Sequence, residues 1–173
     1  MTTWANRGMQ LEEEVESSNL AYWLRGTAVV QKVATPFKPI RDGNGNFRRL
    51  IPAKKSTVDF IGCLDGRGLA FDAKETRERN RFPLENVKEH QVQFLEKYRN
   101  VGGHAFLLVR FVKHRETFIL TADALAKWWD VAIHGGRKSI PHEWFLENCE
   151  AVGSRNGIVI DYLHPILAKK VAT

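Results

Sequence analysis

The feature that most constrains this fold is a pair of short apolar runs separated by a glycine-containing turn. The first run, residues 57–63, contains Asp59, and the second, residues 69–74, contains Asp72. The Asp65-Gly66 dipeptide between them is typical of a two-residue hairpin turn when apolar runs flank it. The sequence therefore predicts two paired strands that bring two carboxylates to one place.

Lys74 follows Asp72 by two residues. Because strand side chains alternate between faces, we expect both on the same face of the sheet. Mg²⁺ prefers hard oxygen ligands, and it can position a water and neutralise a phosphodiester. An Asp-x-Lys tripeptide is usually a surface ion pair, but a carboxylate within a core-like strand needs a compensating cation. We therefore predict that Asp59 and Asp72 bind a metal. Lys74 is predicted to orient the attacking water or to stabilise the charge that develops on the phosphate.

Two further polar residues lie beside apolar positions of predicted helices. Gln91 falls in the inward-facing seam of a helix predicted over residues 86–99. It is either a core glutamine with internal hydrogen bonds or a carbonyl that binds the metal or its water. Glu12 lies beside the apolar face of a helix predicted over residues 8–25. An acid there normally faces solvent; alternatively, Glu12 completes the site by ligating a second metal or a bound water.

Positive charge is concentrated in one segment of the chain. Residues 32–55 contain seven cations and one acid, a net charge of +6 that equals the net charge of the whole chain. Prolines and glycines interrupt residues 34–55, which we predict to form a projecting loop or a two-stranded arm with its tip at residues 42–46. A solvated surface loop is the simpler alternative, but this density of cations favours contact with phosphates. The candidate DNA-binding residues are Lys38, Arg41, Arg48, Arg49, Lys54 and Lys55.

The remaining pattern predicts a mixed sheet flanked by helices, an α/β (α+β) fold. Besides the elements named above, we predict strands over residues 27–33, 104–111, 116–120 and 157–163, and helices over residues 122–133 and 141–146. The composition, 43% hydrophobic and 27% charged, is that of a globular protein, and we expect a single domain over residues 1–173 with residues 34–55 inserted.

Neither a membrane partner nor export is expected. We find no apolar run long enough to cross a membrane and no apolar stretch of a signal peptide. Cys63 and Cys149 lack the spacing of a zinc site, so we expect two reduced, packed thiols. A cytoplasmic location fits these observations best.

Several short motifs, in this order, resemble the RecU family of Holliday junction resolvases. They are Asn6-Arg7-Gly8-Met9, Leu11-Glu12, Ser17-Ser18-Asn19 with Tyr22, Thr35-Pro36, Ser56-Thr57-Val58-Asp59, Phe71-Asp72-Ala73-Lys74-Glu75-Thr76, Phe82-Pro83-Leu84 and His90-Gln91. The resemblance covers roughly the first 110 residues. It implies a restriction-endonuclease-like PD-(D/E)xK nuclease that works as a homodimer on four-way junction DNA and makes paired nicks in opposing strands.

The resemblance also implies roles for single residues. Mg²⁺, with Mn²⁺ as a substitute, is expected near Thr57, Asp59, Asp72 and Gln91, with Lys74 as the transition-state stabiliser. The family's stalk, which enters the junction, corresponds to residues 34–55. One departure concerns Asp72, where the family usually has a glutamate, and another concerns the tip of the stalk.

The sequence therefore predicts a Mg²⁺-dependent, structure-selective endonuclease that resolves Holliday junctions in recombination and repair. One alternative is a restriction- or repair-type nuclease that cuts ordinary duplex. The other is a non-catalytic DNA-binding protein that assists recombination.

Overall fold

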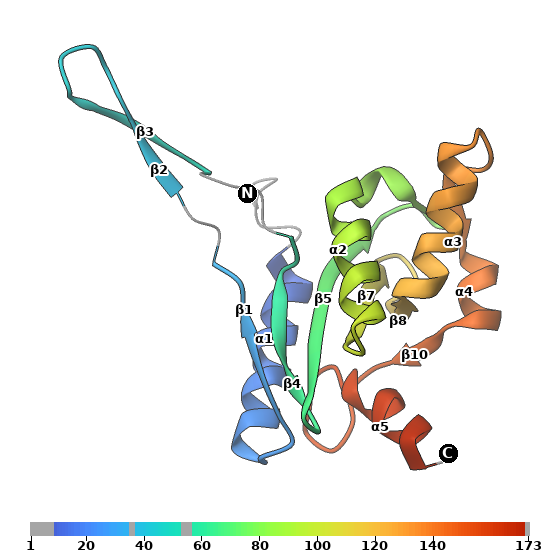
Figure 1. Ribbon diagram of the computed structural model, residues 1–173. Helices are drawn as coiled ribbons and strands as arrows, with labels where there is room; N and C mark the ends of the chain where they lie inside the picture. The colour runs from blue at the N-terminus through green and yellow to red at the C-terminus, as the bar shows by residue number, and fades with distance from the viewer. Residues whose placement is uncertain (1–8, 35–36, 53–56, 172–173) are drawn as a thin grey trace.

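The computed structural model describes residues 9–34, 37–52 and 57–171 (Figure 1). Its centre is a six-stranded sheet in the order β1-β4-β5-β7-β8-β10. The strands are β1 (Ala28–Lys32), β4 (Phe60–Leu64), β5 (Arg67–Thr76), β7 (His104–Phe111), β8 (Glu116–Thr121) and β10 (Glu150–Val152). Strands β5 and β7 are parallel and the other neighbours are antiparallel, so the prediction of a mixed sheet is confirmed.

The hairpin predicted from the two apolar runs is β4–β5. Leu64 pairs with Arg67, and Asp65 and Gly66 between them have φ values of 51° and 75°. Two successive positive φ values fit a two-residue turn that matches the twist of the strands. The pairing begins at Phe60 rather than at residue 57, so Asp59 lies just before the strand and not within it.

Helices cover both faces of the sheet (Figure 1). Helix α1 (Met9–Leu24) buries Leu11, Val15 and Tyr22 against the face that carries Phe60 and Phe71. The other face packs against α2 (Glu89–Asn100), α3 (Ala122–Ile133) and α4 (His142–Asn148). Successive residues of β5 therefore belong to two different cores.

An antiparallel pair outside the main sheet forms the segment that Figure 1 shows extending away from the body. Strands β2 (Phe37–Arg41) and β3 (Phe47–Pro52) pair with each other. The Asp42 carboxylate closes the turn, because its Oδ1 atom accepts hydrogen bonds from the backbone amides of Asn44 and Asn46. We call β2 and β3 the arm. Thr35-Pro36 and residues 53–56 lie outside the described residues, as do residues 6–8 of the first motif.

The C-terminal part differs most from expectation. The strand predicted over residues 157–163 is wrong: Ile158 makes an isolated bridge to Arg155, and β10, at Glu150–Val152, is the last strand of the sheet. Buried Ile158, Ile160 and Tyr162 give the segment a strand-like alternation, but they pack against the α1 side of the sheet. Helix α5 (Leu163–Val171) follows them.

A second small ribbon was not predicted. Strand β6 (Arg81–Pro83) pairs with β9 (Ser139–Pro141), and a 3-10 turn at Leu84–Asn86 then leads to α2. Both cysteines are free, but Cys63 is exposed, which corrects the expectation of two packed thiols. Within the described ranges, we find no helix that combines the length and apolar character needed to cross a membrane.

Candidate active site

The Asp72 carboxylate is the centre of the site. Its side chain is 0% exposed, yet both of its oxygens have partners. Oδ1 accepts a 2.9 Å hydrogen bond from the backbone amide of Asp59, and Oδ2 lies 2.6 Å from Lys74 Nζ and 2.6 Å from Gln91 Nε2. A buried carboxylate is costly unless such partners replace its hydration. The site therefore brings together three segments of the chain: the residue just before β4, strand β5 and helix α2.

Lys74 reaches the same face of the sheet as Asp72, as strand alternation predicts. Its side chain is 20% exposed, whereas that of Asp72 is fully buried. The ammonium group thus sits between the buried acid and the solvent. A cation held in this way can meet a phosphate that approaches from outside.

Asp59 provides the second carboxylate. Its Oδ2 atom accepts a 3.3 Å hydrogen bond from the backbone amide of Ala73. Burial, followed by the hydrogen bond and the negative charge of Asp72, raises the pKa of Asp59 to about 7, while Lys74 and the Ala73 amide oppose the shift. Two acids therefore share a small volume that disfavours two negative charges.

This donor set fits a hard divalent cation. Asp59 and Asp72 present carboxylate oxygens, which Mg²⁺ and Mn²⁺ prefer. The pKa of Asp59 is raised first by burial and then by the neighbouring Asp72 carboxylate, and a bound cation would favour the ionised form of both acids. Asp59 and Asp72 are thus the residues that would hold the metal.

Metal ligation would need the side-chain oxygen of Gln91 to point toward the acids, but here its nitrogen does. Its Nε2 atom donates to Asp72, and its Oε1 atom accepts a 3.0 Å hydrogen bond from the backbone amide of Lys88 at the start of α2. Turning the amide over would direct the oxygen toward the acids and release the Lys88 amide. In this structure Gln91 is a buried, internally hydrogen-bonded glutamine that positions Asp72.

Two of the predicted site residues make no described contact with the acids. Thr57 is exposed in a bend two residues before Asp59, and among the described residues no hydrogen bond joins it to Asp59 or Asp72. Glu12 Oε2 lies 3.0 Å from Lys32 Nζ, and Glu16 shares the same lysine. Helix α1 covers the opposite face of the sheet from α2, so Glu12 approaches from the other side.

The candidate DNA-binding residues of the arm are solvent-exposed. They are Lys38, Arg41, Arg48 and Arg49; Lys54 and Lys55 lie outside the described residues. Arg41 Nη1 donates to the Gly45 carbonyl and steadies the tip. The sequence reading missed the exposed apolar side chains between these cations, Phe37, Phe47 and Leu50, of which Phe47 is 60% exposed. Their signal was available, because apolar residues and cations occur together along both strands.

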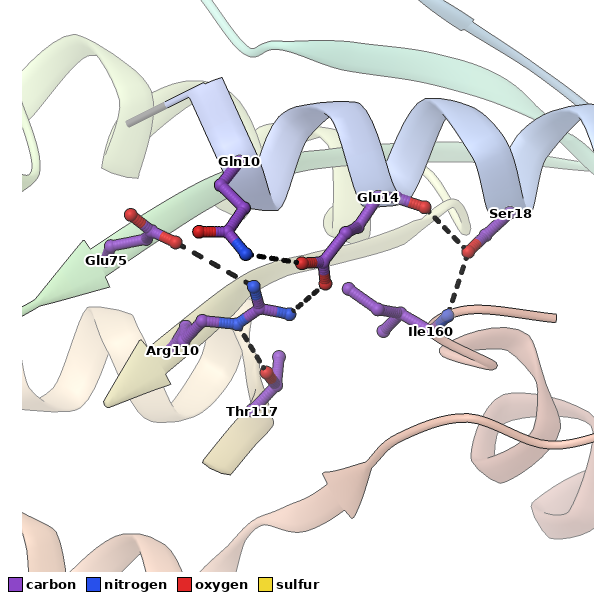
Figure 2. Close-up of polar contacts among 7 residues, drawn as sticks. All are labelled: Gln10, Glu14, Ser18, Glu75, Arg110, Thr117 and Ile160. Carbon is purple, nitrogen blue, oxygen red and sulfur yellow. Dashed lines mark hydrogen bonds and ion pairs between the residues drawn. The ribbon is translucent and has the colours of Figure 1, made fainter. Parts of the chain in front are cut away.

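A charged network on the α1 face holds the far side of β5 (Figure 2). Arg110 Nη2 contacts Glu14 Oε2 at 2.5 Å, its Nη1 lies 3.9 Å from Glu75 Oε1, and its Nε donates to Thr117 Oγ1. Burial raises the pKa of Glu75, and the charge of Arg110 opposes that shift. Glu75 directly follows Lys74, so this network fixes β5 from the face opposite the acids.

A second cluster able to hold a divalent metal consists of His114, Glu116 and His142. The imidazole rings stack with centroids 4.2 Å apart, and His142 Nε2 lies 2.6 Å from Glu116 Oε2. His114 Nε2 bonds to the Arg79 carbonyl at 2.8 Å. Sequence spacing did not reveal this cluster, because its members come from the β7–β8 turn, β8 and α4.

The sequence matches a family of recombination proteins. The family model described as RecU, Recombination protein U, matches residues 6–168. The Holliday junction resolvase RecU of Pediococcus pentosaceus is 35% identical over 168 residues, which cover 94% of this chain and 84% of that protein. The Holliday junction resolvase RecU of Geobacillus kaustophilus is 38% identical over 145 residues, 81% of this chain and 72% of that protein.

A solved structure of Archaeoglobus fulgidus Hjc, a Holliday junction resolvase, aligns with a TM-score of 0.46 and 12% identity over 81% of this chain and 93% of that one. The family assignment depends on the sequences. Because the RecU model covers nearly the whole chain and both RecU relatives exceed 30% identity, this chain belongs to the RecU family.

Proposed function

We propose that this protein is a structure-selective DNA endonuclease that resolves four-way junctions. The observation that carries the proposal is the buried Asp72 carboxylate, which lies beside Asp59 and contacts Lys74 Nζ and Gln91 Nε2 at 2.6 Å each. Two acids and an ammonium at one point suit phosphodiester hydrolysis. Membership of the RecU family, and relatives that are named Holliday junction resolvases, support four-way junction DNA as the substrate.

We propose Mg²⁺ as the cofactor, with Mn²⁺ as a substitute. Asp59 and Asp72 would hold the ion. Gln91 would assist only by turning its amide over and releasing the Lys88 amide, and Thr57 only by turning its side chain toward the acids. When bound, such an ion neutralises charge on the scissile phosphate and lowers the pKa of a bound water. Glu12 would join the site only by leaving Lys32, its present partner at 3.0 Å.

Lys74 is the proposed catalytic cation. Its Nζ atom is held by Asp72 at the partly exposed rim of the site, where it would stabilise the negative charge that develops on the phosphate oxygens. Aspartate is one methylene shorter than the glutamate that the family usually has at position 72. Here the Lys74 and Gln91 side chains both approach Asp72 to 2.6 Å, so the shorter acid is fully engaged.

The arm and a homodimer would supply junction selectivity. Exposed Lys38, Arg48 and Arg49 lie on a ribbon that extends from the body, and phosphates of the junction would bind there (Figure 1). A second copy would supply the second nick. Large apolar side chains on α1 and the edge strand β1 offer a surface for it: Leu20, Trp23, Leu24 and Val29, of which Leu24 is 75% exposed.

Cleavage of a four-way junction, compared with linear duplex of the same sequence, tests this proposal. With Mg²⁺, we expect paired nicks in opposing strands of the junction and much slower cutting of the duplex. Equal rates on the two substrates would favour an ordinary duplex nuclease. Junction binding without cleavage in Mg²⁺ or Mn²⁺ would favour a non-catalytic accessory protein.

A further inference from the structure

The loop at residues 77–80 continues directly from the strand that carries the site and leads into β6. Arg77 follows Lys74 by three residues. The loop backbone is anchored at several points: the Glu78 amide donates to Thr76 Oγ1, the Asn80 carbonyl accepts from the His142 amide, and the Arg79 carbonyl bonds to His114 Nε2. Its side chains are therefore presented from a fixed backbone.

This loop and its surroundings carry an excess of positive charge. A hollow of ≈ 420 Å³ is lined by Arg77, Glu78, Arg79, Asn80, Arg81 and Lys113. Its single acid, Glu78, already contacts Arg81 at 3.4 Å. Arg79 and Lys113 are exposed, and within the described part of the chain neither forms an ion pair with an acid. Two unneutralised cations thus stand at the end of β5.

The positive charge continues into a neighbouring hollow of ≈ 880 Å³ that shares Glu78 and Arg81 with the first. Arg137 and Lys138 line it, and the β6–β9 ribbon brings them beside the loop. We call the combined set the loop surface: Arg77, Arg79, Arg81, Lys113, Arg137 and Lys138. Its six cations face two acids in the linings, Glu78 and Glu85. Acids elsewhere in the chain balance these six cations in the net charge, so the net charge alone does not reveal the cluster.

We infer that the loop surface binds backbone phosphates of the duplex arm that leads away from the scissile phosphate. The inference rests on the proposed nuclease function. Strand geometry places Arg77 roughly 10 Å from Lys74 along the chain, which is about three base-pair rises of DNA. A phosphate held at Lys74 would therefore bring backbone phosphates about three base pairs further along the same duplex over the loop. Because the hollows offer cationic side chains to a polyanion, the contacts are independent of base sequence.

The loop surface is separate from the arm. The arm is formed by β2 and β3 and extends away from the sheet (Figure 1). The loop surface combines the segment from the end of β5 to the start of β6, the β7–β8 turn and the two residues just before β9. The arm would thus contact the junction, and the loop surface would contact one of its duplex arms. The two contributions can be measured apart.

The test removes the two unpaired cations with the double variant Arg79→Ala/Lys113→Ala. Its matched control is Lys97→Ala/Lys127→Ala, which removes two exposed lysines from α2 and α3. Binding of a four-way junction is followed by fluorescence anisotropy in EDTA over a series of salt concentrations. The slope of log K against log salt should fall by about 2 in magnitude for the test variant, about 0.9 per lost phosphate contact. The control should keep the wild-type slope.

A slope and affinity equal to those of the control would overturn the inference. Both test side chains are exposed, so the melting temperature should equal that of wild type; Arg79→Gln/Lys113→Gln repeats the test with longer polar side chains. In Mg²⁺, the test variant should need a higher junction concentration for half-saturation than wild type. This fold-change should exceed the fold-loss of its cleavage rate at saturating junction. Wild type that neither binds nor cuts junctions would contradict the proposed function. If wild type binds and cuts junctions but the test variant behaves like the control variant, only the inference about the loop surface is contradicted.

Discussion

The side-chain amide of Gln91 donates a 2.6 Å hydrogen bond to the buried Oδ2 atom of Asp72, while its oxygen accepts from the backbone amide of Lys88. One side chain thereby joins the start of α2 to the acid on β5. A polar residue in an apolar helix seam is thus explained by two partners, the buried Asp72 carboxylate and the part-buried Lys88 amide. Removing it should change both the stability of the fold and the position of the acid.

We expect Gln91→Ala to lower the free energy of unfolding by about 1–3 kcal/mol, because buried polar groups lose a partner. Urea denaturation of the metal-free protein measures the change. Gln93→Ala is the matched control, since Gln93 lies on the same helix and bonds to Glu89 at an exposed position. Equal losses in the two variants would contradict the assigned role of Gln91.

The raised pKa of Asp59, about 7 against an ordinary 3.8, sets a direction for pH dependence. Between these values the folded protein holds a proton that the unfolded chain has released. The contribution of Asp59 to the free energy of unfolding should therefore be greatest below pH 3.8, fall as pH rises to about 7, and stay constant above.

Metal binding should displace the proton from the Asp59 carboxyl group. Mg²⁺ affinity is expected to increase from pH 6 to pH 8, with proton release on binding below pH 7. Calorimetry in two buffers with different ionisation enthalpies counts the protons, and Asp59→Asn should remove the linkage. A wild-type affinity that is flat over this range would contradict the pKa assignment.

Lys74→Ala should impair cleavage far more than binding. Oxyanion-stabilising donors typically contribute about 10²–10³ in rate, so we expect a loss of that order at saturating junction and saturating Mg²⁺. The loss of one charge should change the junction Kd only slightly, because the loop surface and the arm contribute most of the attraction. A Kd increase as large as the rate loss would show that Lys74 mainly binds DNA.

Arg48→Ala/Arg49→Ala tests the arm. Both side chains are exposed on β3, so the fold should tolerate their loss. Junction binding should weaken, and the salt slope should fall by about 2 in magnitude, as expected for two lost phosphate contacts. A wild-type salt slope would place the arm outside the interface.

Those parts of the fold that depend on neighbouring residues were predictable from the sequence. The Asp65-Gly66 turn specified the β4–β5 hairpin, and the spacing of Leu11, Val15 and Tyr22 specified α1. Strand alternation then placed Lys74 beside Asp72. Each of these signals lies within a short stretch of sequence: a turn dipeptide, a helical spacing and a strand alternation.

Features that depend on distant contacts were not predictable. Residues 157–163 alternate like a strand, but Ile158, Ile160 and Tyr162 bury themselves against the α1 side of the sheet instead of joining it. The β6–β9 ribbon pairs segments more than fifty residues apart. The cations that it brings together are therefore distant in the sequence, and counting charges along the chain does not reveal the cluster. Nor could spacing decide between the two roles of Gln91, because its partners lie at Lys88 and Asp72.

The central claim is that Asp59 and Asp72 form a metal-dependent nuclease site, and single-turnover cleavage of a four-way junction by wild type and Asp59→Ala tests it most directly. We predict that wild type makes paired nicks in Mg²⁺ and that Asp59→Ala binds the junction with near-wild-type affinity but does not cut it. Cleavage by Asp59→Ala at the wild-type rate would contradict the claim, as would a wild type that cuts in neither Mg²⁺ nor Mn²⁺.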